Sequence, residues 1–301
     1  MDQAADSTSK PLIRANGREL RRALKEEIYQ ALGLAPDTRL RHLINPLVWA
    51  PTSSFARLAE KFDRIVADSG LPAGARQVLP RLISRLEVRG QDSVPKQGPV
   101  LVAANHPGAA DMLAIASSLP RDDVKVVVSD LPFFRGLPNA ARHFIYTPIL
   151  DSSQRMEVVR ACIRHLREGG TLLIFPRGVV EPDPDHLPGA EESISNWSAS
   201  LGVIARAVPQ VEIVTAIVSG VLSRSSLNNP IARLRSQPRD RQRLAEFLQV
   251  IEQMISPVWP AVSARVSFGR PMRATSEDAR SVTRQVIEDA RRLLGKHMAA
   301  A

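Results

Sequence analysis

The first 80 residues carry hydrophobic positions at helical spacing. Along segment 18–33 they recur every four residues, with arginine and lysine between them: Leu20, Leu24, Ile28 and Leu32. Such spacing places side chains on one face of a helix. Similar patterns predict a second helix over 38–48 that ends near Pro51, a third that begins at 52–54 and breaks at 70–74, and a fourth over 78–86. Residues 1–80 are therefore predicted to form a small helical bundle, after a loose segment at 1–13.

From about residue 85 onward, short β-branched runs alternate with helical patterns. Seven runs predict strands, over 85–90, 99–105, 124–130, 143–149, 171–176, 211–220 and 264–269. The patterns between them predict helices over about 110–119, 153–168, 190–207, 238–256 and 276–297. Strands that alternate with helices build a largely parallel sheet with both faces covered. We therefore expect an α/β domain over residues 81–301, with a largely parallel mixed sheet flanked by helices.

Composition and charge narrow the classes of protein. The chain has 301 residues, 44% hydrophobic and 24% charged, which are globular proportions. Its 40 lysines and arginines against 31 acidic residues give a net charge of +9, which attracts nucleic acid, anionic lipid headgroups or phosphorylated substrates. The sequence lacks zinc-finger spacing and an aromatic RNA-binding strand, so we expect no nucleic acid partner. The basic segment 224–243 lacks clear periodicity and is predicted to be an exposed excursion.

Cysteine use and targeting signals point to the cytoplasm. A single cysteine, Cys162, excludes an internal disulfide and a multi-cysteine metal site. The N-terminus lacks the layout of a signal peptide, and the most apolar window, 211–222, is too short to span a membrane and contains Glu212. We expect a cytoplasmic protein whose membrane contact, if any, is peripheral on the inner face. The basic helix over 18–33 could lie on an anionic membrane or pack its apolar stripe into the bundle.

The candidate chemistry lies in LVAANHPGAAD at 101–111, where a strand pattern ends at a histidine. Ligands of α/β sheets bind beyond the carboxyl ends of strands, which is the position of His106. On one continuous helix His106 and Asp111 would lie roughly 140° apart. With His106 on the Pro-Gly turn and Asp111 in the first helical turn, the carboxylate can accept from Nδ1–H and leave Nε2 as a general base. The protein then supplies no nucleophile, so we expect a substrate hydroxyl to be the nucleophile.

These residues resemble a known family. VLVAANHPGAAD resembles the H-x4-D block of the glycerolipid acyltransferase superfamily, the lysophosphatidic acid acyltransferase (PlsC-like) family. LREGGTLLIFPRGVVEPDP resembles that family's strand-borne F-P-E-G block, and FIYTPILDSSQR and VEIVTAIVSG occupy the places of two weaker blocks. The resemblance covers roughly residues 85–225. It implies an acyltransferase that uses no metal and no bound cofactor.

The chain also departs from the family pattern. Arg177 replaces the glutamate of F-P-E-G, and Glu181 follows four residues later. Ser152 follows Asp151 where the family has arginine, and Arg155 is the nearest substitute. In the family these positions help to bind the acceptor's phosphate. The resemblance therefore implies the chemistry more firmly than it implies the acceptor.

The candidate site combines the strand-end histidine with the family blocks. We assign His106 and Asp111 as catalytic; the alternatives are a structural strand-end histidine and an ordinary carboxylate at a helix start. Arg177 could grip a phosphate or be a solvated surface arginine. The substrate-binding set is Asn105, Gly108, Arg155, Phe175, Pro176, Arg177 and Gly178. The Pro-rich loop at 181–193 could cover the site as a lid, and Trp197 could belong to the core or to the wall of an acyl tunnel.

The expected reaction follows from the dyad and the resemblance together. His106 takes the proton of an acceptor hydroxyl, which attacks the thioester of acyl-CoA or an acyl carrier protein, while backbone N–H groups of the turn or Arg177 hold the oxyanion. The acceptor is a lysophospholipid, glycerol phosphate or other lipid. Two alternatives remain: a thioesterase or lipid hydrolase that activates water with the same dyad, and a non-catalytic lipid-binding protein of the same fold.

Overall fold

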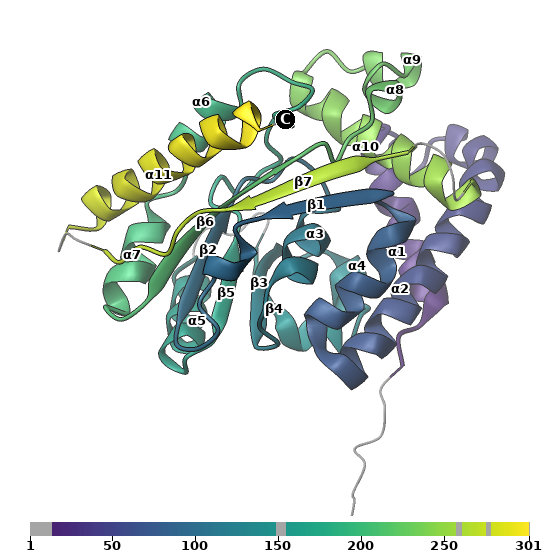
Figure 1. Cartoon of the computed structure of the whole chain (residues 1–301). Coiled ribbons are helices and arrows are strands. Elements are labelled where there is room, and N and C mark those ends of the chain that lie inside the picture. Colours follow the sequence, from purple (N-terminus) through teal and green to yellow (C-terminus); the bar gives the residue numbers. More distant parts are fainter. Residues whose placement is uncertain (1–13, 149–154, 257–260, 275–277, 301) are drawn as a thin grey trace, which may run out of the picture.

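The computed structural model describes residues 14–148, 155–256, 261–274 and 278–300 and contains one sheet flanked by helices (Figure 1). All seven predicted strands are present in the described part of the chain, and the mixed, largely parallel α/β fold is confirmed. Their order is β1-β7-β6-β2-β5-β3-β4, and only the β6–β7 pairing is antiparallel. The strands are β1 (Arg85–Arg89), β2 (Val100–Ala104), β3 (Val124–Ser129), β4 (Phe144–Thr147), β5 (Thr171–Ile174), β6 (Glu212–Ser219) and β7 (Ser263–Phe268).

The central strand β2 separates two hydrophobic core layers. Successive side chains of a strand point to opposite faces, and every residue of β2 is buried. Val100, Val102 and Ala104 join the layer that contains α2 (Leu40–Val78) and α3 (Asp111–Ser118). Leu101 and Ala103 join the layer that contains α5 (Arg155–Arg167), α7 (Ser200–Ala207) and α11 (Ala279–Ala299). The residue that follows β2 therefore emerges from the middle of the sheet.

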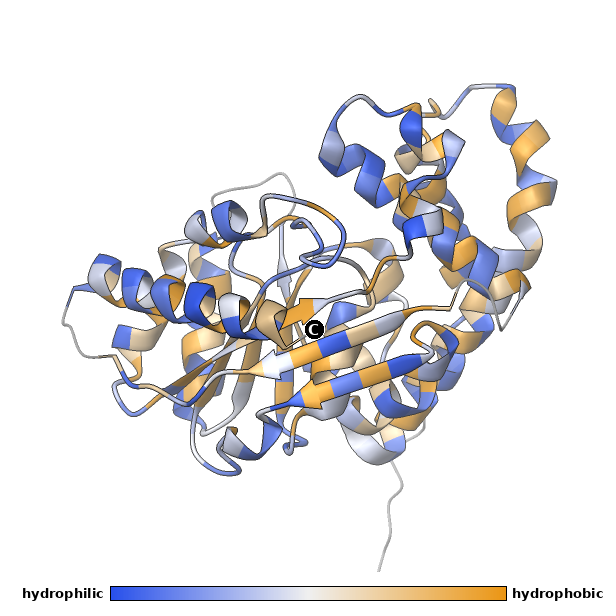
Figure 2. Cartoon of the chain, turned by 45° about the horizontal axis from the view of Figure 1, so that its top comes forward, coloured by the Kyte–Doolittle hydropathy of each residue, from blue (hydrophilic) through white to orange (hydrophobic). Residues whose placement is uncertain are grey.

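The edge strand β1 is less buried, and its pattern differs accordingly. Hydrophilic and hydrophobic positions alternate along β1 (Figure 2), with Arg85, Glu87 and Arg89 between Leu86 and Val88. Charged side chains on an edge strand discourage pairing with another chain. The charged side chains of β1 thus protect this edge of the sheet from pairing with another strand.

The N-terminal helices differ from the prediction in two places. Helix α1 (Gly17–Ala31) is as expected, but α2 continues through Pro51, so the predicted end near that residue is wrong. The hydroxyl groups of Thr52 and Ser53 donate to the carbonyls of Val48 and Trp49 at 2.5 and 2.7 Å, which stabilises the helix across the proline. The predicted break at 70–74 corresponds to a kink at Gly70, where φ is 79°.

The predicted fourth helix, 78–86, is wrong. Helix α2 ends at Val78, a 3-10 turn covers Leu79–Arg81, and β1 begins at Arg85. Pairing with β7 from Arg85 onward outweighs the local helical pattern. Side chains of α2 share one core layer with the sheet, and the division of the chain near residue 80 stays a prediction.

The C-terminal half contains two further differences. The predicted helix 190–207 is split into α6 (Ala190–Ser195) and α7, because the chain turns at Trp197 to bring its indole inward. The segment 224–243 is not simply exposed. It forms α8 (Arg224–Leu227), α9 (Pro230–Arg233) and the start of α10 (Pro238–Ile255), and it buries Ser226, Ala232 and Gln242. Among the described residues, no helix is both long enough and apolar enough to cross a membrane.

Candidate active site

The structure brings His106 and Asp111 into direct contact at the carboxyl end of β2. The Nδ1 atom of His106 lies 2.7 Å from Oδ2 of Asp111. The Asp111 side chain is fully buried, whereas the His106 side chain is 28% exposed. The same Oδ2 accepts the Gly108 N–H at 3.0 Å, so the carboxylate closes the turn that carries the histidine. This arrangement engages Nδ1 with Asp111, and Nε2 has no hydrogen-bond partner among the described residues.

A second carboxylate holds the backbone of the same turn. Glu181, 1% exposed, accepts the His106 N–H at 2.9 Å through Oε2 and the Trp197 indole N–H at 3.1 Å through Oε1. The Glu181 N–H donates in return to the His106 carbonyl at 2.7 Å. Glu181 therefore links the turn of His106 to the loop after β5, and Trp197 supports this contact from the core.

The loop that was expected to act as a lid is anchored inside the protein. Asp183 is fully buried and accepts three backbone N–H groups: those of Gly220 (2.8 Å), Asp185 (3.1 Å) and Leu222 (3.2 Å). Carboxylates with this many donors hold a loop firmly. The first part of segment 181–193 is a structural support beneath the site, so the lid interpretation is wrong for this part.

Carboxylates around His106 control its proton affinity. Burial of the imidazole disfavours its charged form, but the carboxylate of Asp111, helped by those of Glu246 and Glu181, outweighs burial and raises the pKa of His106 to about 9. Burial raises the pKa of Glu246 to about 7 and also raises the pKa of Glu181. His106 is thus a strong base once it has lost its proton.

Asn105 and Gly108 have structural contacts in the turn. The Asn105 amide donates to the Val218 carbonyl at 2.9 Å and accepts the Val218 N–H at 2.7 Å, so it extends the β2–β6 pairing by one residue. At Gly108, a Cβ atom would lie 3.2 Å from Oε1 of Glu246 and 3.3 Å from Cγ2 of Val221. A side chain at this position would require the Glu246 carboxylate and Val221 to shift.

The Phe-Pro-Arg-Gly turn after β5 lies beside the dyad. The ring of Phe175 stacks on the His106 imidazole, with a centroid distance of 4.7 Å and an angle of 33°. Pro176 is buried and its carbonyl accepts from Ser198, while Gly178 has a φ of 68° that favours glycine. Arg177 is exposed and forms no ion pair within the described ranges. The turn therefore carries an exposed arginine two residues after the aromatic ring that contacts His106.

Arg155 is not brought to the dyad. It is exposed at the first residue of α5, which follows the edge strand β4, and β4 is separated from β2 by two strands. In the part of the chain that the structure describes, no hydrogen bond or ion pair joins Arg155 to His106. The neighbouring departures from the family pattern, Asp151 and Ser152, lie outside the described residues.

Sequence reasoning missed two residues of α10. Gln242 donates to the carbonyls of Pro107 (2.8 Å) and Glu181 (2.7 Å), and Glu246 accepts the Ala109 N–H. Both lie more than 130 positions from the turn they hold, and Gln242 fell in the segment predicted to be exposed. The available signal was a series of polar residues at helical spacing within an amphipathic helix.

Comparison with known proteins identifies the domain that contains this site. The family model described as Acyltransferase matches residues 85–219, from β1 to the end of β6. Residues 85–219 are thus similar to the acyltransferase family. This agrees with the resemblance of the H-x4-D and Phe-Pro-Arg-Gly segments, and the enzyme class implied by those segments is confirmed. The matched range contains the dyad and ends before α10.

This chain is also similar to a solved structure, that of the 1-acyl-sn-glycerophosphate (LPA) acyltransferase PlsC from Thermotoga maritima. The identity is 12%, the TM-score is 0.49, and the match covers 93% of this chain and 97% of that chain. No curated protein matches the sequence.

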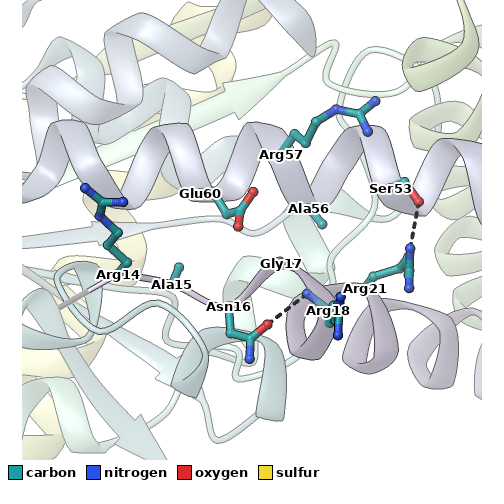
Figure 3. Close-up of a pocket in the computed structure, with 10 residues that line it drawn as sticks. All are labelled: Arg14, Ala15, Asn16, Gly17, Arg18, Arg21, Ser53, Ala56, Arg57 and Glu60. Atoms are coloured by element: carbon teal, nitrogen blue, oxygen red, sulfur yellow. Dashed lines mark hydrogen bonds between the residues drawn. The ribbon is translucent and has the colours of Figure 1, made fainter.

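A basic groove lies between α1 and α2 (Figure 3). Its volume is about 650 Å³. One wall comes from the start of α1 and the residues before it, and the other comes from α2. Arg21 donates to the Ser53 hydroxyl at 3.4 Å, and its guanidinium lies 5.7 Å from the centre of the Trp49 ring. Four arginines and one glutamate supply the charges of the groove: Arg14, Arg18, Arg21, Arg57 and Glu60.

Proposed function

We propose that this enzyme transfers a fatty acyl group from a thioester to the hydroxyl of a lipid acceptor. The donor is acyl-CoA or an acylated carrier protein, and the acceptor is a lysophospholipid, a glycerol phosphate or a related lipid alcohol. The observation that carries the proposal is the 2.7 Å contact between His106 and Asp111 at the end of β2. This contact lies within the residues that match the acyltransferase family.

The proposed chemistry needs one proton carrier and no protein nucleophile. Asp111 accepts from Nδ1–H, and Nε2 of His106 takes the proton of the acceptor hydroxyl while its oxygen attacks the thioester carbonyl. The tetrahedral intermediate then expels the thiolate, which receives the proton from the imidazolium. The products are the acylated acceptor and the free thiol of the carrier. Phe175, stacked on the ring, holds the imidazole against tilting.

The oxyanion requires a positive group from outside the turn. The N–H groups of His106, Gly108 and Ala109 each donate to a carboxylate, and Pro107 has no N–H. This pairing argues against the expectation that backbone groups of the turn hold the oxyanion. We therefore assign Arg177, which is exposed next to Phe175, to the oxyanion or to an acceptor phosphate. Arg155 is a more distant candidate for the phosphate.

An acyl-transfer assay tests this function directly. The protein is incubated with radiolabelled acyl-CoA or acyl carrier protein, with and without lysophospholipids, glycerol phosphate and other lipid alcohols. The proposal predicts a labelled acylated acceptor, and no such product with the His106→Asn variant. Free fatty acid formed at the same rate with and without acceptors would instead identify a thioesterase. Lipid binding without turnover of any donor would identify a non-catalytic protein.

We further propose peripheral contact between the N-terminal helices and an anionic membrane. The apolar side of α1 is turned inward, since Leu20 and Ile28 are 0% and 5% exposed, so α1 does not offer it to lipid. On α2, by contrast, Leu40, Leu43 and Leu47 are 51%, 71% and 73% exposed at helical spacing. Exposed leucines together with a basic groove are typical of proteins that bind anionic bilayers. The proposal places the enzyme in the cytoplasm, at the inner face of the membrane.

Vesicle sedimentation tests the membrane proposal. The double variant Leu43→Ser/Leu47→Ser should bind phosphatidylglycerol vesicles about tenfold more weakly, because it loses part of the apolar burial of two leucines. Changing Arg18, Arg21 and Arg57 to glutamine should weaken binding and reduce its dependence on salt. Leu234→Ser, at an exposed leucine after α9, is the matched control and should bind like the wild type. Equal binding by all variants would contradict the proposal.

A further inference from the structure

Helix α10 carries a polar stripe whose side chains contact segments around the active site. Its members are spaced four, three and four residues apart and share one helical face: Gln242, Glu246, Gln249 and Gln253. The three glutamines are each 4% exposed. Buried polar side chains are costly unless they are hydrogen-bonded, and each of these four bonds to a backbone group of another segment. The stripe therefore positions the backbone of these segments, a role that apolar side chains in a core could not have.

Two members of the stripe, Gln242 and Glu246, contact the backbone of the turn that follows His106. Gln242 donates to the carbonyls of Pro107 and Glu181, so one amide ties the His106 turn to the loop after β5. Glu246 accepts the N–H of Ala109, one turn of α10 later. Because Gly108 lies between these contacts and has no Cβ, the turn can approach the Glu246 carboxylate closely.

The other two members hold segments that flank two strands, β6 and β1. Gln249 accepts the Ser223 N–H at 2.7 Å and donates to the Val221 carbonyl at 2.9 Å, just beyond β6. Gln253 donates to the Leu82 carbonyl at 2.8 Å, just before β1. Gln249 and Gln253 thus fix α10 against the sheet independently of Glu246. A change confined to the charge of Glu246 should leave the helix in place.

The charged groups that face His106 come from three different elements. They are Asp111 at the start of α3, Glu181 in the loop after β5 and Glu246 on α10. All three favour the imidazolium form, which arises when the ring has taken a proton. Arg243 acts on Glu246 as a positive charge, and it also pairs with Glu27 of α1 at 3.1 Å. Glu246 therefore directs its negative charge at the turn of His106.

We propose that Glu246 is a positioning residue for His106, which it serves by holding the turn through the Ala109 N–H and by stabilising the imidazolium formed during acyl transfer. This inference rests on the proposed function, because it assigns Glu246 to the same proton transfer. It also extends the active site beyond residues 85–219, since α10 lies outside the range that matches the family.

The decisive experiment measures the titration of His106 separately from activity. The imidazole of His106 is followed by NMR in the wild type and in Glu246→Gln, whose amide oxygen can still accept the Ala109 N–H. We expect His106 to titrate about one pH unit lower in the variant, because a nearby opposite charge is lost. The acid limb of kcat/KM should move by the same amount, so the rate on that limb rises about tenfold.

Two further variants separate charge from contact. Glu252→Gln removes another carboxylate of α10 that has no contact with the turn, and it should change neither the titration nor the profile. Glu246→Asp keeps the charge but shortens the side chain, so the titration of His106 should move less than in Glu246→Gln. It also provides the test if Glu246→Gln fails to fold.

The outcomes distinguish this inference from the proposed function. An unchanged titration of His106 in Glu246→Gln would overturn the role of Glu246, whatever the activity. A lower pKa of His106 with an unchanged pH dependence of kcat/KM would support the contact of Glu246 with His106. It would contradict the role of His106 as the base. Matching shifts of the His106 pKa and of the acid limb of kcat/KM would support both the role of Glu246 and the role of His106 as the base.

Discussion

Replacing His106 by asparagine should lower kcat/KM for acyl transfer by about 10³-fold, because a positioned general base contributes 10²–10⁴. The substitution removes Nε2, the atom that takes the proton, while leaving a smaller polar side chain whose amide can still donate to Asp111. The Michaelis constant for the donor should change little, since the ring itself is assigned no donor contact. Steady-state rates with the labelled donor and the best acceptor provide the measurement.

The variant Asp111→Asn tests whether this loss arises from the His106–Asp111 pair. It replaces the negative carboxylate, whose Oδ2 faces both Nδ1 and the Gly108 N–H, by a neutral amide. The NH2 group of that amide can donate to Nδ1, so the ring can adopt the wrong tautomer. We expect a loss of about 10²–10³-fold, and no further loss when it is combined with His106→Asn. Retention of activity within tenfold by His106→Asn would contradict the general-base role. Unchanged thermal unfolding of both variants is the required control.

Replacing Asp183 by alanine should lower the free energy of unfolding by about 3–5 kcal/mol. The fully buried carboxylate accepts three backbone N–H groups, and each donor left without a partner costs about 1–3 kcal/mol. The sum is reduced because the variant no longer buries a charge. Urea unfolding at pH 7 measures the loss, and activity should fall with it because Asp183 anchors the loop that begins at Glu181.

A matched substitution separates this effect from a general loss of charge. Asp240→Ala removes an exposed carboxylate at the start of α10 and should change the free energy of unfolding by less than about 0.5 kcal/mol. Asp183→Asn retains one acceptor oxygen and should fall between the two. A change below 1 kcal/mol for Asp183→Ala would show that the loop is held by other contacts.

The sheet could be predicted because its strands are short apolar runs buried on both faces. Val100 to Ala104 has no polar interruption, and the segments between the runs are helical in period. The helix boundaries were less predictable where distant contacts decided them. The residues around Pro51 are held by hydroxyl groups that bond backward, and the chain turns at Trp197 because its indole reaches Glu181. Local periodicity contains no information about either contact.

The dyad could be predicted because its two members are five residues apart. A turn of known composition followed by a helix determines their separation, and the structure brings them together at 2.7 Å. The supporting residues are distant in sequence: Glu181 is 75 positions from His106, and Glu246 is 137 positions from Ala109. Their role depends on how α10 and the loop after β5 pack, which no local pattern specifies. The same packing pairs the backbone N–H groups of His106, Gly108 and Ala109 with carboxylates, although the sequence analysis expected such groups to hold the oxyanion.

The pH dependence of kcat/KM tests the general-base role most directly. Below the pKa of His106, about 9, the imidazole is protonated and cannot accept the acceptor's proton. The account therefore predicts a rate that rises with pH between 6 and 9, approaching tenfold per pH unit at the acid end, and the loss of this limb in His106→Asn. A rate that is constant or falls over the same range, or an unchanged limb in His106→Asn, would contradict it.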